Sequence, residues 1–251
     1  MHDLPKLCTV YLQIRKTFSE YYISVSIMLV ALLYLTTLIT KCISAHDQVT
    51  NSCESLVAKP KHSGKCDCFH QLMEIRCEGL TNVPHFFGFN CVFIGVYMAK
   101  QSIRQLEAEA FAHLPTRRLV LNFNDIEDRL HATAFSGNLS KFVQELYVGA
   151  CKLRDLPSGL FNKMYSLTVL HLWHNRINEI PAGLFINCGN LRELILSHNN
   201  IASLNVNTFT GLRSLRKLDL DCNKISALLR EIFIGLTNIQ VSLTFLIYFI
   251  V

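Results

Sequence analysis

The chain has 251 residues, half of which are hydrophobic, and this composition excludes an intrinsically disordered protein. Its formal net charge is +5. Residues 1–45 carry four positive and two negative charges, so the remainder carries +3. This mild positive charge predicts no nucleic-acid partner, although it leaves anionic glycans open.

The N-terminal segment, residues 1–45, contains an apolar core at 21–40 that has no charged residue and is long enough to cross a bilayer. Three basic residues precede this core and one follows it, so the positive-inside rule places the rest of the chain outside the cell. The core fits a signal peptide cleaved after Ala45, and it also fits an uncleaved type II membrane anchor. Translation from Met28 would shorten the leader. Each alternative predicts a secreted or cell-surface protein, with membrane association through residues 21–40.

Residues 46–92 form a linker followed by a cysteine-rich stretch, KCDCFHQLMEIRCEGLTNVP. This stretch contains Cys66, Cys68 and Cys77, and Cys53 lies further upstream. The Cys-x-Cys spacing differs from that of zinc fingers, so we predict no metal site here. In an exported chain, clustered cysteines favour disulfides.

Residues 93–238 contain a repeat of about 24 residues. Phenylalanines recur at positions 111, 135, 161, 185, 209 and 233. Three consecutive units read LTVLHLWHNRINEIPAGLFINCGN, LRELILSHNNIASLNVNTFTGLRS and LRKLDLDCNKISALLREIFIGLTN, and three looser units start at Phe93, Thr116 and Val143. A sustained period of this length predicts a solenoid, in which each unit buries its apolar side against its neighbours.

The three consecutive units follow the pattern L-x-x-L-x-L-x-x-N-x-I, which the earlier units match more loosely. The leucines flank a short strand and point into the core, and the late phenylalanine fills the same interior. The asparagine lies where the strand turns inward, and its amide can bond backbone groups of adjacent turns. These asparagines are Asn124, Asn175, Asn199 and Asn223, and Gln101 and Cys151 replace them in two units.

This pattern resembles the leucine-rich repeat family over about residues 66–239. The resemblance implies an α/β solenoid, a curved horseshoe with a parallel sheet on its concave face. With its cysteine-rich N-terminal cap, the chain resembles extracellular members such as Slit-like guidance proteins, chaoptin-like adhesion proteins and leucine-rich repeat receptor ectodomains. In such caps the first cysteine pairs with the third and the second with the fourth, which implies Cys53–Cys68 and Cys66–Cys77. The state of Cys91, Cys188 and Cys222 stays open.

One unit is longer than the others, with extra residues between Ile126 and Val143. We expect them to form a bulge on the outer, convex side. The bulge includes Asn138-Leu-Ser140, a sequon for N-glycosylation that is either used at Asn138 or left unmodified.

Outward positions of the strands should share the concave face. Leu170 and Leu172 point inward, so Trp173, the only tryptophan, should point out. The ring either binds a partner or covers a neighbouring strand; aromatic side chains gathered on one surface favour binding. The predicted contact residues are Tyr97, Phe123, Tyr147, His171, Trp173, His174 and His198. His174, His198 and Cys222 share a column that could approach a metal ion, but such columns are more often solvated, so no metal or cofactor is predicted.

We therefore expect an exported protein that binds a protein or glycan through its concave face, in cell-surface recognition, adhesion or a receptor ectodomain. A structural matrix component and a type II anchored protein are the alternatives. No catalytic set is recognisable, so the chain is not expected to be an enzyme. Residues 239–251 start a seventh unit or form an artefactual hydrophobic tail. The period places leucine-like residues at 242 and 244, where Ser242 and Thr244 stand instead, and this mismatch predicts a truncated gene model.

Overall fold

The structure is a computed structural model that describes residues 64–87, 92–236, 239–242 and 248–250. The chain divides into two units, Met1–Gln48 and Val49–Val251, and every described residue belongs to the second. The expected N-terminal apolar helix at 21–40 therefore lies outside the described residues. Within the described ranges, no helix is long and apolar enough to cross a membrane.

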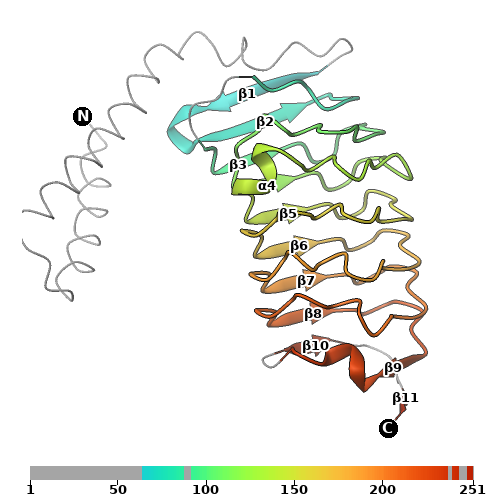
Figure 1. Ribbon diagram of the computed structural model, residues 1–251. Helices are drawn as coiled ribbons and strands as arrows, with labels where there is room; N and C mark the ends of the chain where they lie inside the picture. Colours follow the sequence, from blue (N-terminus) through green and yellow to red (C-terminus); the bar gives the residue numbers. More distant parts are fainter. Residues whose placement is uncertain (1–63, 88–91, 237–238, 243–247, 251) are drawn as a thin grey trace, which may run out of the picture. The chain divides into compact units, whose positions relative to one another are not determined.

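The second unit is a solenoid in which most turns contain one strand of three residues, joined by irregular segments (Figure 1). We call one such turn a coil. The elements are β1 Lys65–Phe69, η1 His70–Leu72, β2 Glu74–Glu78, β3 Gly95–Tyr97, β4 Arg118–Val120, α4 Asn138–Phe142, β5 Glu145–Tyr147, β6 Val169–His171, β7 Glu193–Ile195, β8 Lys217–Asp219, β9 Ala227–Leu229, η2 Arg230–Phe233, β10 Gln240–Ser242 and β11 Tyr248–Ile250.

The strands form a nine-stranded sheet in the order β1-β2-β3-β4-β5-β6-β7-β8-β10. β1 and β2 pair antiparallel, and every later neighbour in this sheet pairs parallel. A second, two-stranded parallel sheet joins β9 and β11. The irregular segments return along the side of the core away from the nine-stranded sheet (Figure 1). This is the leucine-rich repeat solenoid that the period of the sequence predicts.

The core consists of columns that repeat from coil to coil. The middle residue of each strand from β3 to β8 is fully buried, as at Leu146, Leu170 and Leu194. Behind them the phenylalanines stack: ring centroids lie 5.9 Å apart between Phe111 and Phe135, 6.5 Å on to Phe161 and 5.8 Å on to Phe185. A single coil could not bury these rings, so the stacking of coils supplies the apolar core.

The asparagine column acts as the sequence predicts. The Asn175 side-chain amide donates to the carbonyls of Val148, at 2.8 Å, and Leu172, at 2.9 Å, while its Oδ1 accepts from the amide of Cys151 at 2.9 Å. Asn124, Asn199 and Asn223 make equivalent bonds. Each asparagine thus satisfies backbone groups of two coils at once, away from water.

The residue before the asparagine position of the repeat has a left-handed backbone, which the sequence pattern does not predict. Its φ is positive in six successive coils, at Lys100, Phe123, Ala150, His174, His198 and Cys222. Residues other than glycine rarely adopt this conformation, which costs on the order of 1 kcal/mol each. Side-chain hydrogen bonds of the next residue, an asparagine in four of these coils, Gln101 in one and Cys151 in another, fix the turn and offset this cost.

The β1–β2 hairpin covers the first parallel strand, β3, and so closes the N-terminal end of the core. A disulfide joins Cys66 to Cys77 across this hairpin, the pair that the family resemblance implied. Cys68 is also disulfide-bonded. Its expected partner, Cys53, lies outside the described residues, as does Cys91. Cys151, Cys188 and Cys222 are free thiols.

Two expectations require correction. The extra residues before Val143 form α4 and pack into the coil, because Leu139 and Ser140 are buried and the Ser140 hydroxyl donates to the carbonyl of Gly137. They therefore do not form a protruding bulge, and Asn138, which stays a predicted glycosylation site, is half-buried. At the C-terminal end, Val241 pairs opposite Leu218. The seventh strand is thus in register one residue earlier than expected, and Ser242 occupies no leucine position.

Candidate functional site

The candidate site lies on the side of the parallel sheet that faces away from the core, which we call the sheet face. Register places Tyr97, Val120, Tyr147, His171 and Ile195 in one row across β3 to β7. Phe123, His174 and His198 lie in the left-handed positions just beyond the strands, and Trp173 precedes one of them. The predicted contact residues therefore fall into two neighbouring groups, one polar and one aromatic.

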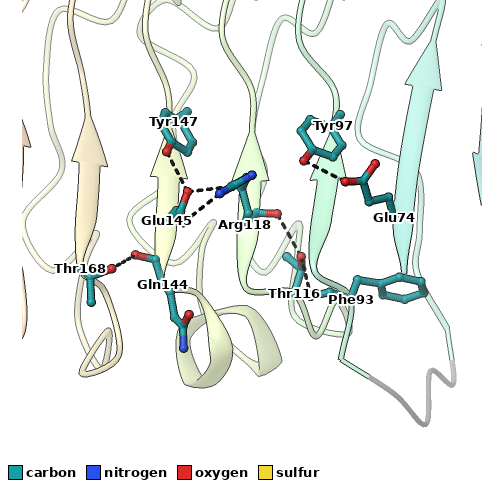
Figure 2. A network of polar contacts seen from close by, with 9 residues as sticks. All are labelled: Glu74, Phe93, Tyr97, Thr116, Arg118, Gln144, Glu145, Tyr147 and Thr168. Atoms are coloured by element: carbon teal, nitrogen blue, oxygen red, sulfur yellow. Dashed lines mark hydrogen bonds and ion pairs between the residues drawn. The ribbon is translucent and has the colours of Figure 1, made fainter. Parts of the chain in front are cut away.

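The polar group begins at β2 and extends across the sheet (Figure 2). The Tyr97 hydroxyl donates to Glu74 at 3.2 Å. Arg118 binds both carboxylate oxygens of Glu145, from Nε at 2.7 Å and Nη2 at 3.0 Å, and the Tyr147 hydroxyl donates to the same carboxylate at 2.7 Å. A carboxylate with three donors is fixed in place, because bidentate guanidinium bonds constrain its orientation.

The same network continues from β6 to β8. His171 Nε2 lies 3.2 Å from Glu193, and Lys217 Nζ donates to the same oxygen at 3.0 Å. The ring of Tyr147 meets that of His171 edge-on, with centroids 4.8 Å apart. We call these residues the polar ladder, which consists of the pair Glu74 and Tyr97 and of the connected residues Arg118, Glu145, Tyr147, His171, Glu193 and Lys217.

Partial burial and these contacts shift the acid–base properties of the ladder. Hydrogen bonds from Arg118 lower the pKa of Glu145 and outweigh the effect of burial. Burial and the bond to Glu145 raise the pKa of Tyr147 to about 12. Burial lowers the pKa of His171, although Glu193 opposes this shift. Burial would raise the pKa of Glu193, but Lys217 and His171 together lower it.

Arg118, Glu145 and Glu193 lie on this face in addition to the predicted contact residues. A signal for their pairing is present in the sequence. Arg118 stands directly opposite Glu145, and Glu193 directly opposite Lys217, in the register that the repeat predicts. Opposite charges at facing positions of adjacent strands stabilise a sheet.

The aromatic group forms a continuous ridge. Trp173 meets Phe123 edge-on at 5.5 Å and His174 edge-on at 5.5 Å. The imidazole of His174 stacks on that of His198, with centroids 4.2 Å apart and planes 7° from parallel. We call Phe123, Trp173, His174 and His198 the aromatic ridge. Phe123 is 47% exposed, and both histidines are exposed, so the ridge borders solvent.

Gly149 determines how the tryptophan lies. A Cβ built on Gly149 would stand 2.5 Å from Cε2 of the Trp173 indole and 2.6 Å from its Nε1. The ring therefore lies across the backbone of the preceding coil, in a space that only a residue without a side chain leaves free. This contact leaves Trp173 half-buried and holds one face of its ring against the chain. Trp173 thus both covers the backbone of Gly149 and forms part of the sheet face.

The column that ends at Cys222 does not assemble as a chelating group. In the described part of the chain, no cluster of three or more His, Cys, Asp or Glu side chains is placed to hold a metal ion. The imidazole rings of His174 and His198 stack face to face.

Comparison with known proteins supports this class of structure. A model of the family described as Leucine rich repeat matches residues 143–201 and 189–241. A search of curated proteins found no match. Among solved structures, 217 chains match. The chain folds as a leucine-rich repeat solenoid.

Three of these structures illustrate the likeness. Toll, in the Drosophila Toll–Spatzle complex, is 25% identical with a TM-score of 0.54, over 58% of this chain and 19% of Toll. Human 5T4, the trophoblast glycoprotein, is 22% identical with a TM-score of 0.51, over 71% of this chain and 79% of that one. A leucine-rich repeat protein of Leptospira interrogans is 22% identical with a TM-score of 0.50, over 60% of this chain and 37% of that one. The chain thus matches well under half of the Toll and Leptospira proteins.

Proposed function

We propose that the chain is an exported leucine-rich repeat protein that binds another protein through its sheet face, as an adhesion molecule or receptor ectodomain does at the cell surface. The observation that carries this proposal is the aromatic ridge, in which Trp173 lies over Gly149 beside an exposed Phe123. Large rings held in one orientation lose little entropy on binding, and for this reason tryptophan is enriched among binding hot spots.

The polar ladder supports the same surface. It borders the aromatic ridge with charged groups whose positions are set by mutual hydrogen bonds, as between Arg118 and Glu145. These groups are therefore already oriented before a partner binds them. An apolar centre beside polar groups is the usual composition of a protein–protein interface.

Export is supported by chemistry as well as by the apolar N-terminal segment. The Cys66–Cys77 disulfide is of a kind that persists outside the cell and in the secretory pathway. Toll, one of the structures that this chain resembles, is seen in complex with Spatzle. That complex supports a protein as the class of partner and names none for this chain.

The proposal is tested by a binding screen on the secreted chain. A tetramerised form would be exposed to cells that each display one extracellular protein, and each hit would be measured again with purified partners. Trp173→Ala should weaken a true hit by about 2 kcal/mol or more, roughly 30-fold, since it removes the centre of the ridge. The secreted yield should stay near normal, because Leu170 and Leu172 still fill the core.

Tyr165→Ala is the matched control. Tyr165 is 60% exposed and lies in the loop before β6, outside both groups of the sheet face. Its loss should leave the affinity unchanged. If the two variants weaken binding equally, or if Trp173→Ala unfolds the chain, recognition through the ridge is refuted.

A further inference from the structure

A second surface is formed by the segments that lead into the strands. We call it the entry edge, and it comprises residues 112–117, 136–144, 162–168, 186–192 and 210–216. These segments contain no aspartate or glutamate. Their basic residues are Arg117, Lys141, Lys163, Arg192, Arg213 and Arg216, all of them exposed.

The charge is specific to this side of the solenoid. The segments that leave the same strands, such as 124–134 and 151–160, contain both signs, and there Lys152 pairs with Asp125. On the entry edge, none of the six basic side chains forms an ion pair with another described residue. The entry edge therefore presents unneutralised positive charge that the chain as a whole, at +5, does not suggest.

The backbone aligns the residues that directly precede the strands, and three of these are basic: Arg117, Arg192 and Arg216. Gln144 and Thr168 occupy the two positions between Arg117 and Arg192. In successive coils the amide of Gln144 donates to the carbonyl of Arg117, Thr168 to Gln144, Arg192 to Thr168 and Arg216 to Arg192, over 2.7 to 2.9 Å. Neighbouring coils are about 4.8 Å apart along a sheet, so Arg117 and Arg216 are separated by about 20 Å. Arg192 and Arg216 face each other directly, and like charges so placed repel unless an anion lies between them.

We propose that the entry edge binds a linear sulfated glycan, whose anionic groups pair with the exposed arginines and lysines that each of the five segments contributes. Guanidinium groups bind such oxyanions through paired hydrogen bonds, and a chain with charges at regular intervals matches a surface that repeats from coil to coil. Since the N-terminal segment predicts export, the polyanions that the chain meets are extracellular glycans. The site shares with the proposed function only the premise of export.

The test is the affinity of the purified secreted chain for a heparin octasaccharide at several salt concentrations. The double variant Arg192→Ser and Arg216→Ser should bind about tenfold more weakly and depend less on salt, because fewer counterions are released. Arg154→Ser with Arg176→Ser is the control: it removes the same charge from exposed positions beyond the strands, and should cause no comparable loss. Circular dichroism checks that both double variants fold.

Three results would overturn the proposal. Equal losses in the two double variants would show attraction to net charge rather than to the entry edge. Equal binding of a desulfated octasaccharide would exclude sulfate recognition. Tighter binding of a single-stranded oligonucleotide of equal charge would assign the edge to nucleic acid. Trp173→Ala should retain full heparin affinity, so a failure of the sheet-face proposal is distinguishable from a failure of this one.

Discussion

At the residue scale, a single glycine sets the position of the only tryptophan. Gly149 and Trp173 lie on adjacent coils, and the indole occupies the space where a Cβ would be. The backbone of Gly149 is not in the left-handed region, so alanine is compatible with it. The role of this glycine is therefore to leave room for a ring, and its substitution tests the ridge without removing Trp173.

Gly149→Ala should displace the Trp173 ring toward water and shift its fluorescence emission to longer wavelength, because a Cβ at 2.5 Å from the indole cannot be accommodated. The single tryptophan makes this signal unambiguous. Gly189→Ala is the control, since a Cβ there meets its nearest atom at an ordinary 3.7 Å. An unchanged emission spectrum in Gly149→Ala would show that the ring does not lie as described.

His171 predicts a dependence of stability on pH. Its pKa in the folded chain is lowered by burial, so the folded state disfavours the charged ring. The stability that this provides is complete above the unfolded pKa of about 6.5 and is lost as the pH falls below it. His171→Gln should therefore show a smaller decrease in melting temperature between pH 7.5 and pH 5 than the wild type. An identical decrease in both proteins would contradict this assignment.

The lowered pKa values of Glu145 and Glu193 act in the same direction at lower pH. Both carboxylates are stabilised as anions in the folded chain, so their contribution is complete above the unfolded pKa of about 4.3 and is lost in more acidic solution. Both are partly exposed, which screens the contribution. Below about pH 4.5 the loss of stability is therefore due to protonation of these carboxylates. The melting temperatures of His171→Gln and the wild type are best compared above this pH.

At the scale of elements, the stacked phenylalanine rings stabilise the packing of one coil on the next. Phe161 is fully buried, with rings 6.5 Å away on one side and 5.8 Å on the other. Phe161→Ala should cost about 3–5 kcal/mol of unfolding free energy in urea, through the cavity left between stacked coils. Phe233 is half-buried, with Phe209 as its stacked neighbour at 6.5 Å, so Phe233→Ala should cost less. Equal costs would contradict the stacking account.

The repeat made these elements predictable. The 24-residue step between phenylalanines and the recurrent asparagine together located the strands, the buried leucines and the amide bonds of Asn175 and Asn199. These features depend only on the repeat period and on the pattern of apolar residues, both of which can be recognised in the sequence of a chain built from similar units. The Arg118–Glu145 pair follows from the same register.

Other features depend on contacts that no period encodes. The left-handed backbone at His174 and His198 follows from the bonds made by the next residue, and glycine, its usual signal, is absent there. The position of Trp173 depends on a missing side chain in a different coil. Likewise, α4 replaces the expected bulge because Leu139 finds a buried site, and β10 shifts by one residue because Val241 can take the place opposite Leu218.

At the scale of the whole solenoid, two surfaces occupy opposite ends of the same short strands. In β7, for example, Arg192 precedes the strand on the entry edge and His198 follows it on the aromatic ridge. The two residues are six positions apart, which corresponds to at most about 20 Å of extended chain. A glycan on the entry edge and a protein on the ridge can therefore be bound together. The hairpin of β1 and β2, with its disulfide, protects the first coil without covering either surface.

Trp173, proposed as the centre of a protein-binding surface, can be observed directly during binding. Labelling the secreted chain with 5-fluorotryptophan introduces a single fluorine, because the chain contains one tryptophan. Its 19F resonance is then recorded while an unlabelled partner from the screen is added. A shift or broadening that saturates with binding, and that the heparin octasaccharide does not produce, is the predicted result. A partner that binds fully while the resonance stays unchanged would contradict this proposal.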